Sequence, residues 1–215
     1  MVVPEFKINQ THKTIFTIQL MKPNEILLKS LRYVKPSLTG LTINTLFTTA
    51  TFQASSVTTL IDYKSQNISS YESTLCLIKT LSTQLKYLKE NLNHTFYEYI
   101  PENVIIIDST QFIYMSSSGL IGLEQNKTIT FNFPFEKSVF SAPEILKIDS
   151  LPTNVCDTSS YYSLGMLTIY YFLSLIPSTE NEIKEALTPI KQTKLYWFLL
   201  KVLDNDPSKR VILFI

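Results

Sequence analysis

The chain has 215 residues, of which 45% are hydrophobic and 17% are charged, a balance that allows one large domain and excludes a disordered polymer. Its net charge of +1 gives no bulk electrostatic reason to expect nucleic acid or an anionic membrane as a partner. Cys76 and Cys156 lie far apart and match no metal-binding spacing, which indicates reduced thiols in an intracellular protein, cytoplasmic or nuclear.

The first part of the chain is rich in β-branched and aromatic residues, which favour strands. Residues 11–20 predict one strand, and residues 41–52 and 57–63 predict two more. Between the first two, the run from Glu25 to Arg32 places apolar residues at helical spacing. We therefore expect three strands and one helix here.

A long amphipathic helix is predicted next. Leucine and isoleucine recur at intervals of three and four over residues 75–88, and Ser69 or Ser70 can cap the start of this helix. The apolar runs 104–107 and 112–115 flank a polar turn and predict a hairpin.

The last third of the chain predicts mostly helices. Residues 128–133 alternate between polar and apolar types, which indicates a fixed strand. Residues 164–176 form the most apolar segment, which predicts a buried helix because it is too short to span a bilayer. Residues 180–187 and 194–203 predict two exposed helices.

Five short motifs follow one another along the second half of the chain. They are Pro101-Glu102-Asn103, the turn Ser117-Ser118-Gly119 after the hairpin, Ala142-Pro143-Glu144, Ser163-Leu164-Gly165, and Asp206-Pro207 shortly before Arg210. Each motif alone is weak, because short triplets arise often by chance. In this order and at these spacings they resemble the landmarks of protein kinases, from the catalytic loop to the end of the domain.

The resemblance to the protein kinase superfamily covers residues 70–212 well and residues 11–63 loosely. It implies an α+β, two-lobed kinase-like fold, with a reduced β-rich N-lobe over residues 1–63 and a mainly helical C-lobe over residues 64–215, together one domain. It also implies a structural ion pair between Glu144 and Arg210. The alternative is an unrelated α+β domain that imitates the order of motifs.

On this register the residues that carry phosphoryl transfer in kinases are replaced. A kinase needs an aspartate for magnesium, a lysine for the phosphates and an aspartate at the acceptor hydroxyl. The degenerate positions are Gln19 for the phosphate lysine, Glu25 for the helix glutamate, Glu98 for the acceptor aspartate, Ile100 for the catalytic-loop lysine, Asn103 for the metal-binding asparagine and Ser117 for the metal aspartate. Lys22 is an alternative for the lysine. No glycine precedes Gly40, so the glycine-rich loop is absent.

These losses favour a pseudokinase that acts as a protein-binding scaffold or allosteric regulator, with no catalytic residue, cofactor or metal. Its expected partners are proteins, such as an active kinase or a multi-subunit complex, and neither nucleic acid nor a membrane. Two alternatives stay open. One is a divergent Ser/Thr protein kinase, with Glu98 as base and Glu102 or Asp108 rescuing the metal. The other is a structural subunit of a larger assembly.

Overall fold

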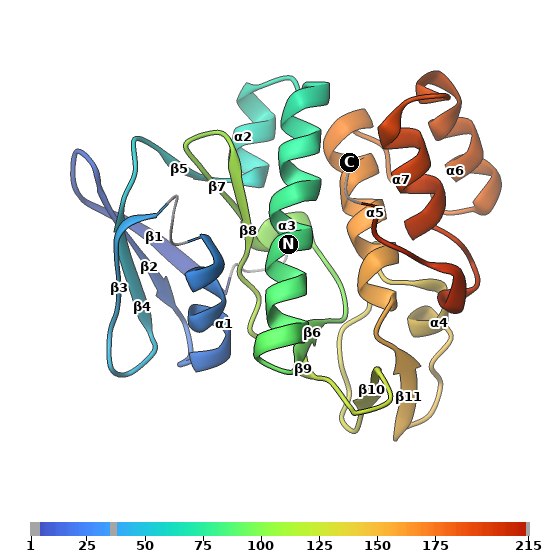
Figure 1. Cartoon of the computed structure of the whole chain (residues 1–215), viewed down its shortest axis with the longest axis horizontal. Coiled ribbons are helices and arrows are strands. Elements are labelled where there is room, and N and C mark those ends of the chain that lie inside the picture. The colour runs from blue at the N-terminus through green and yellow to red at the C-terminus, as the bar shows by residue number, and fades with distance from the viewer. Residues whose placement is uncertain (1–4, 35–37, 214–215) are drawn as a thin grey trace.

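The computed structural model describes residues 5–34 and 38–213, which form helices and four small antiparallel sheets in a mixed α+β architecture (Figure 1). The first sheet has four strands in the order β1-β2-β4-β3. Its strands are β1 (Phe6–His12), β2 (Ile15–Leu20), β3 (Thr39–Ile43) and β4 (Thr49–Gln53). Helix α1 (Glu25–Ser30) and the 3-10 turn η1 (Leu31–Val34) follow β2, and both pack against the long helix of the next layer.

Two predicted strands in this sheet are wrong, because each is divided by a turn. Residues 11–20 do not form one strand, since the chain reverses between His12 and Ile15 and makes the β1–β2 hairpin. The strand predicted over residues 41–52 is interrupted by a turn that Asn44 holds. Its Oδ1 accepts hydrogen bonds from the backbone N–H groups of Thr48 and Thr49, at 2.9 and 3.0 Å.

A third predicted strand, over residues 57–63, is wrong in its second half. The chain enters helix α2 (Leu60–Gln66) directly after the short strand β5 (Val57–Thr59). Thr59 caps this helix, because its hydroxyl oxygen accepts from the backbone N–H of Asp62 at 3.1 Å and donates to the Asp62 carboxylate at 2.7 Å. The capping pair therefore overrides the β-branched composition of the segment.

The middle layer is a three-stranded sheet, in the order β5-β7-β8, packed against the long helix α3. Its further elements are α3 (Tyr71–Asn91), β6 (His94–Phe96), the 3-10 turn η2 (Pro101–Asn103), β7 (Val104–Ile107) and β8 (Gln111–Tyr114). Ser70 and Ser73 form a reciprocal capping box at the start of α3, so the predicted helix is confirmed. The predicted hairpin is confirmed as β7–β8.

Gln84 of α3 holds the outer edge of β8. Its buried side-chain amide donates to the carbonyl oxygen of Tyr114 at 2.9 Å and accepts from the N–H of the same residue at 2.9 Å. A backbone edge that would otherwise be buried without partners is satisfied in this way by a helix side chain. The hairpin is thereby fixed against the helix.

The last part of the chain adds two short ribbons and the C-terminal helices. The remaining elements are β9 (Leu120–Gly122), β10 (Thr128–Phe131), α4 (Pro143–Leu146), β11 (Thr153–Cys156), α5 (Ser159–Leu173), α6 (Glu180–Leu187), η3 (Thr188–Ile190), α7 (Lys194–Val202) and η4 (Pro207–Lys209). β9 pairs with β6, and β10 pairs with β11. The predicted strand at residues 128–133 and the three predicted helices are confirmed, with boundaries that differ by a few residues.

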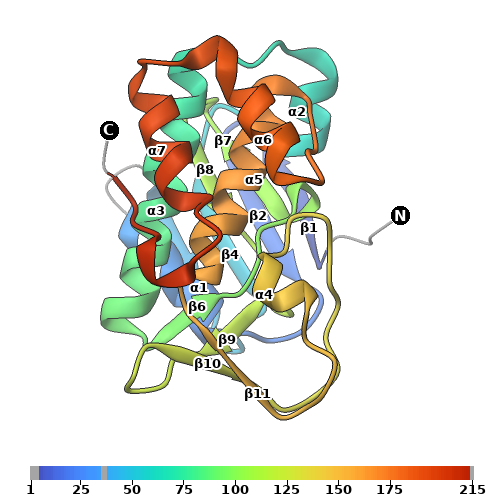
Figure 2. The ribbon, with the colours of Figure 1, turned by 90° about the vertical axis from the view of Figure 1, so that its right-hand side faces the viewer.

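Figure 1 shows the four-stranded sheet at one end of the molecule and α5, α6 and α7 at the other, with α3 between them. The view of Figure 2 places β10 and β11 at one end and α2 and α6 at the opposite end. One continuous hydrophobic cluster runs from the first sheet to α7. Within residues 5–34 and 38–213, none of the helices combines the length and apolar character that crossing a membrane requires.

Candidate functional site

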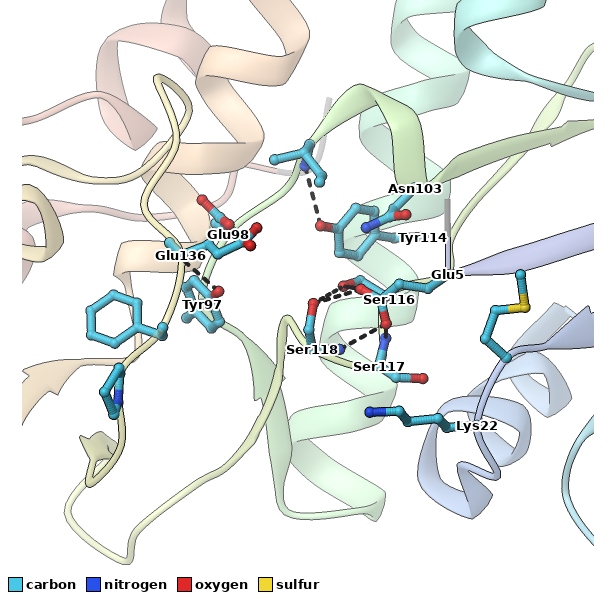
Figure 3. A pocket seen from close by; sticks show the side chains of 14 residues that line it. Glu5, Lys22, Tyr97, Glu98, Asn103, Tyr114, Ser116, Ser117, Ser118 and Glu136 are labelled. Carbon is cyan, nitrogen blue, oxygen red and sulfur yellow. Dashed lines mark hydrogen bonds between the residues drawn. The ribbon is translucent and has the colours of Figure 1, made fainter. Parts of the chain in front are cut away.

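A cavity of about 870 Å³ opens between the start of β1, the β7–β8 hairpin and the segment that follows β10. Figure 3 shows Tyr97, Glu98 and Glu136 on one side. On the other side lie Glu5, Lys22 and the serines Ser116, Ser117 and Ser118, which belong to the serine turn (Ser116–Gly119). The complete lining is Glu5, Met21, Lys22, Tyr97, Glu98, Ile100, Asn103, Tyr114, Ser116, Ser117, Ser118, Pro134, Phe135 and Glu136. The cavity therefore brings together segments from the first sheet, the middle layer and the last third of the chain.

Four of the six degenerate positions line this cavity, namely Glu98, Ile100, Asn103 and Ser117. The other two lie elsewhere. Gln19 is exposed on β2, between neighbours that point into the core, and Glu25 forms an ion pair along α1 with Lys29 at 2.5 Å. Lys22 lines the cavity, so the structure places the alternative lysine, and not Gln19, at the site.

The two acids considered for rescuing a metal also lie outside the cavity lining. Asp108 accepts hydrogen bonds from the backbone N–H groups of Ser55 and Ser56, at 2.7 and 2.9 Å, and so fixes the loop before β5. Glu102 is half-buried in η2 and does not line the cavity. Neither residue lines the cavity together with Asn103.

Glu98 is the most buried acid of the cavity, with 6% of its surface exposed. Its Oε2 accepts hydrogen bonds from the hydroxyl groups of Ser138 and Ser141, at 2.8 and 2.7 Å. Burial raises the pKa of the Glu98 carboxyl above its ordinary value, and the two hydroxyl donors act in the opposite direction. Glu98 thus anchors the segment just before the Ala-Pro-Glu motif.

Asn103 and Tyr114 form the inner wall. The backbone of Asn103 donates to the Ile100 carbonyl at 3.2 Å and accepts from Met115 N–H at 2.8 Å, while Ile100 N–H donates to the Tyr114 hydroxyl at 3.2 Å. Asn103 is 1% exposed, and its Oδ1 has no hydrogen-bond partner in the part of the chain that the structure describes. Burial raises the pKa of Tyr114, so its phenol stays protonated at neutral pH.

The turn Ser116-Ser117-Ser118-Gly119 binds the carboxylate of Glu5. The backbone N–H groups of Ser117 and Ser118 donate to Oε2, at 2.8 and 3.0 Å. The hydroxyl groups of Ser116 and Ser118 donate to Oε1, at 2.8 and 2.5 Å. The turn therefore presents hydrogen-bond donors to the cavity.

These donors do not fit a divalent metal ion, which needs oxygen ligands that face it. Ser117, at the position of the metal aspartate in the kinase register, turns its N–H group toward Glu5. Within the described residues there is no group of three or more His, Cys, Asp or Glu side chains that could hold a metal ion.

Glu144 and Arg210 form a bidentate ion pair away from the cavity. Nη1 lies 2.5 Å from Oε1 and Nη2 lies 2.8 Å from Oε2, and the arginine side chain is fully buried. Nε of Arg210 donates to the Asp204 carbonyl at 2.7 Å, and the guanidinium lies 5.0 Å from the ring centroid of Tyr162. The pair joins α4 to the end of the chain, across 66 positions of sequence.

Sequence reasoning missed Glu5, Glu136 and the serines that bind Glu98. Glu5 contacts residues 111 to 113 positions away, so no local pattern points to it. The alternation on β2 was a usable signal, because buried Ile18 and Leu20 leave Gln19 on the outer face.

Comparison with known proteins gives no relative, since no family model matches the sequence and no curated protein matches it. The resemblance to protein kinases therefore stays a prediction.

Proposed function

We propose that the protein is a pseudokinase that acts as a protein-binding scaffold or allosteric regulator and transfers no phosphoryl group. Residues 1–63 serve in this proposal as a reduced N-lobe and residues 64–215 as a C-lobe. The order of the five sequence motifs supports the proposal. So does the Glu144–Arg210 pair, whose two residues come from the third and the fifth of these motifs.

The observation that best supports the absence of nucleotide chemistry is that Glu5 occupies the hydrogen-bond donors of the serine turn. Magnesium and the phosphates of a nucleotide need a metal-binding carboxylate and positive charge around the phosphate oxygens. Here the turn at Ser117 offers donors that Glu5 already satisfies. Three carboxyl groups, those of Glu5, Glu98 and Glu136, line the cavity together with one ammonium group, that of Lys22. An anionic triphosphate is repelled by such a lining.

Glu98 supports the same conclusion. Two hydroxyl donors bind its Oε2, and both belong to the segment that leads into the Ala-Pro-Glu motif. Its contacts are those of an anchor between this segment and the loop that carries Ile100 and Asn103. The proposal assigns it a structural role and no proton transfer.

The proposed function is tested by comparing the wild type with Glu98→Gln and Lys22→Ala. Glu98→Gln removes the candidate base, and Lys22→Ala removes the cation in the cavity. We expect both variants to capture the same partners from native cells, in the same amounts, with unchanged phosphorylation of those partners. Loss of partner phosphorylation, in variants whose melting temperatures match the wild type, would favour a divergent Ser/Thr kinase.

A further inference from the structure

The serine turn is built to hold a carboxylate. Each oxygen of Glu5 receives two hydrogen bonds, one oxygen from two backbone N–H groups and the other from two hydroxyl groups. Hydrogen bonds from backbone N–H groups to an ionised carboxylate belong to the stronger class. Successive N–H groups that converge in a turn are a known form of anion-binding concavity. The donors match the flat, two-oxygen shape of a carboxylate.

The turn is also organised independently of Glu5. The Ser116 hydroxyl oxygen accepts a hydrogen bond from Gly119 N–H at 2.9 Å, which directs its own proton toward Glu5. A Cβ atom at Gly119 would lie 3.0 Å from this hydroxyl oxygen, so glycine permits the close approach. Ser116 and Gly119 are buried, whereas Ser118 is exposed. The donor geometry therefore belongs to the turn, and one side of it faces solvent.

The ligand reaches the turn from a distant part of the chain. Glu5 lies directly before β1, where its carbonyl oxygen accepts from Met21 N–H at 2.9 Å. The serine turn and Glu5 both line the cavity of about 870 Å³, so a carboxylate from outside has a path to the same donors. Glu98 and Glu136 also line the cavity, and their charges favour a singly charged ligand over a doubly charged phosphate.

We propose that the Ser116–Gly119 turn is a carboxylate-binding site, held by Glu5 in the isolated chain and open to an acidic side chain of a protein partner that displaces it. The site does not depend on kinase ancestry, because its donors are those of the turn itself. The ligand that this site would bind is a singly charged carboxylate, whose charge is opposite in sign to that of a metal ion. A partner with an exposed Glu or Asp would exchange with Glu5 and release the link between β1 and the turn.

The test uses the full chain with Glu5→Ala, and Glu136→Ala as the matched control that removes a carboxylate from the same cavity but leaves the turn filled. Acetate is titrated against chloride at constant ionic strength, and the backbone amides of Ser117 and Ser118 are followed by NMR. We expect saturable shifts of these two amides in Glu5→Ala alone. Their hydrogen exchange should accelerate by about tenfold or more in this variant and slow again with acetate, because the lost bonds are charge-assisted.

Two further ligands separate the possible sources of the anion. Inorganic phosphate should give weaker saturation than acetate, and a glycine peptide with blocked ends and a single glutamate should shift the same amides when its glutamine analogue does not. Binding of acetate without binding of the single-glutamate peptide would overturn the claim that a partner's side chain enters. Absence of saturation with acetate in Glu5→Ala, or a response of the wild type or of Glu136→Ala as large as that of Glu5→Ala, would overturn the site itself.

If Glu5→Ala fails to fold, a second variant, Glu5→Gln, still tests the proposal. Glu5→Gln keeps the shape of the side chain but places an amide where the turn offers donors. We expect this variant to show faster exchange of the Ser117 and Ser118 amides than the wild type, while the amides of α3 keep their protection. Wild-type exchange rates at the turn in Glu5→Gln would contradict the proposal.

Discussion

Arg210→Ala is the substitution whose cost the structure defines best. The guanidinium is fully buried. It makes two hydrogen bonds to Glu144, one to the Asp204 carbonyl at 2.7 Å, and longer ones to the carbonyl groups of Thr158 and Asn205. Removal of one partner of a buried ion pair costs about 3–5 kcal/mol, because the other charge is left without compensation. The Glu144 side chain is 20% exposed, so water can reach it after the change, and this favours the lower end, about 3 kcal/mol.

Urea unfolding measures this cost. With a slope of about 2–3 kcal/mol/M, a loss of about 3 kcal/mol lowers the midpoint by about 1–1.5 M. Arg210→Lys should recover only part of it, because an ammonium group cannot make the bidentate contact. Lys184→Ala, which breaks the exposed pair of Glu180 and Lys184, is the control and should leave the midpoint unchanged. A midpoint for Arg210→Ala that matches this control would refute the reasoning.

Three other substitutions are expected to act as follows. Gly165→Ala should lower stability by about 1–3 kcal/mol despite the helix propensity of alanine, because the new Cβ would lie 2.7 Å from a Val202 methyl; a higher urea midpoint would contradict this. Gln84→Leu should cost about 2 kcal/mol or more, since both backbone groups of Tyr114 lose a buried partner, and an unchanged midpoint would contradict it. Burial raises the pKa of the Glu98 carboxyl, so the folded state binds the carboxyl proton more tightly than the unfolded state does. The free energy of unfolding therefore falls as the pH rises from 4.5 through the raised pKa. Glu98→Gln should remove that slope above pH 4.5, and an unchanged slope would contradict the assignment.

The features of the fold that depend on residues close together in the sequence could be predicted. The capping box of Ser70 and Ser73 and the leucine spacing of α3 lie within one segment, so both were readable from the sequence. The prediction for residues 57–63 was wrong in its second half, because the β-branched residues favour a strand while Thr59 caps a helix. Thr59 and Asp62, three positions apart, carried the correct signal.

The site was only partly predictable for a different reason. The motif that ends at Asn103 and the turn at Ser117 were found because their residues are consecutive. Glu5 was not found, since its contact with the turn depends on how the first sheet sits against the middle layer. Packing between distant segments decides such contacts, and a single sequence carries no pattern for them.

Titration with ATP, with and without magnesium, tests most directly whether the cavity binds a nucleotide. A ligand at about one hundred times its dissociation constant stabilises a folded protein by about 2.7 kcal/mol, which a melting curve resolves readily. We expect millimolar ATP with magnesium to leave the melting temperature of the wild type unchanged. A magnesium-dependent rise that Lys22→Ala abolishes would contradict the proposed absence of nucleotide binding and with it the proposal that the protein is a pseudokinase.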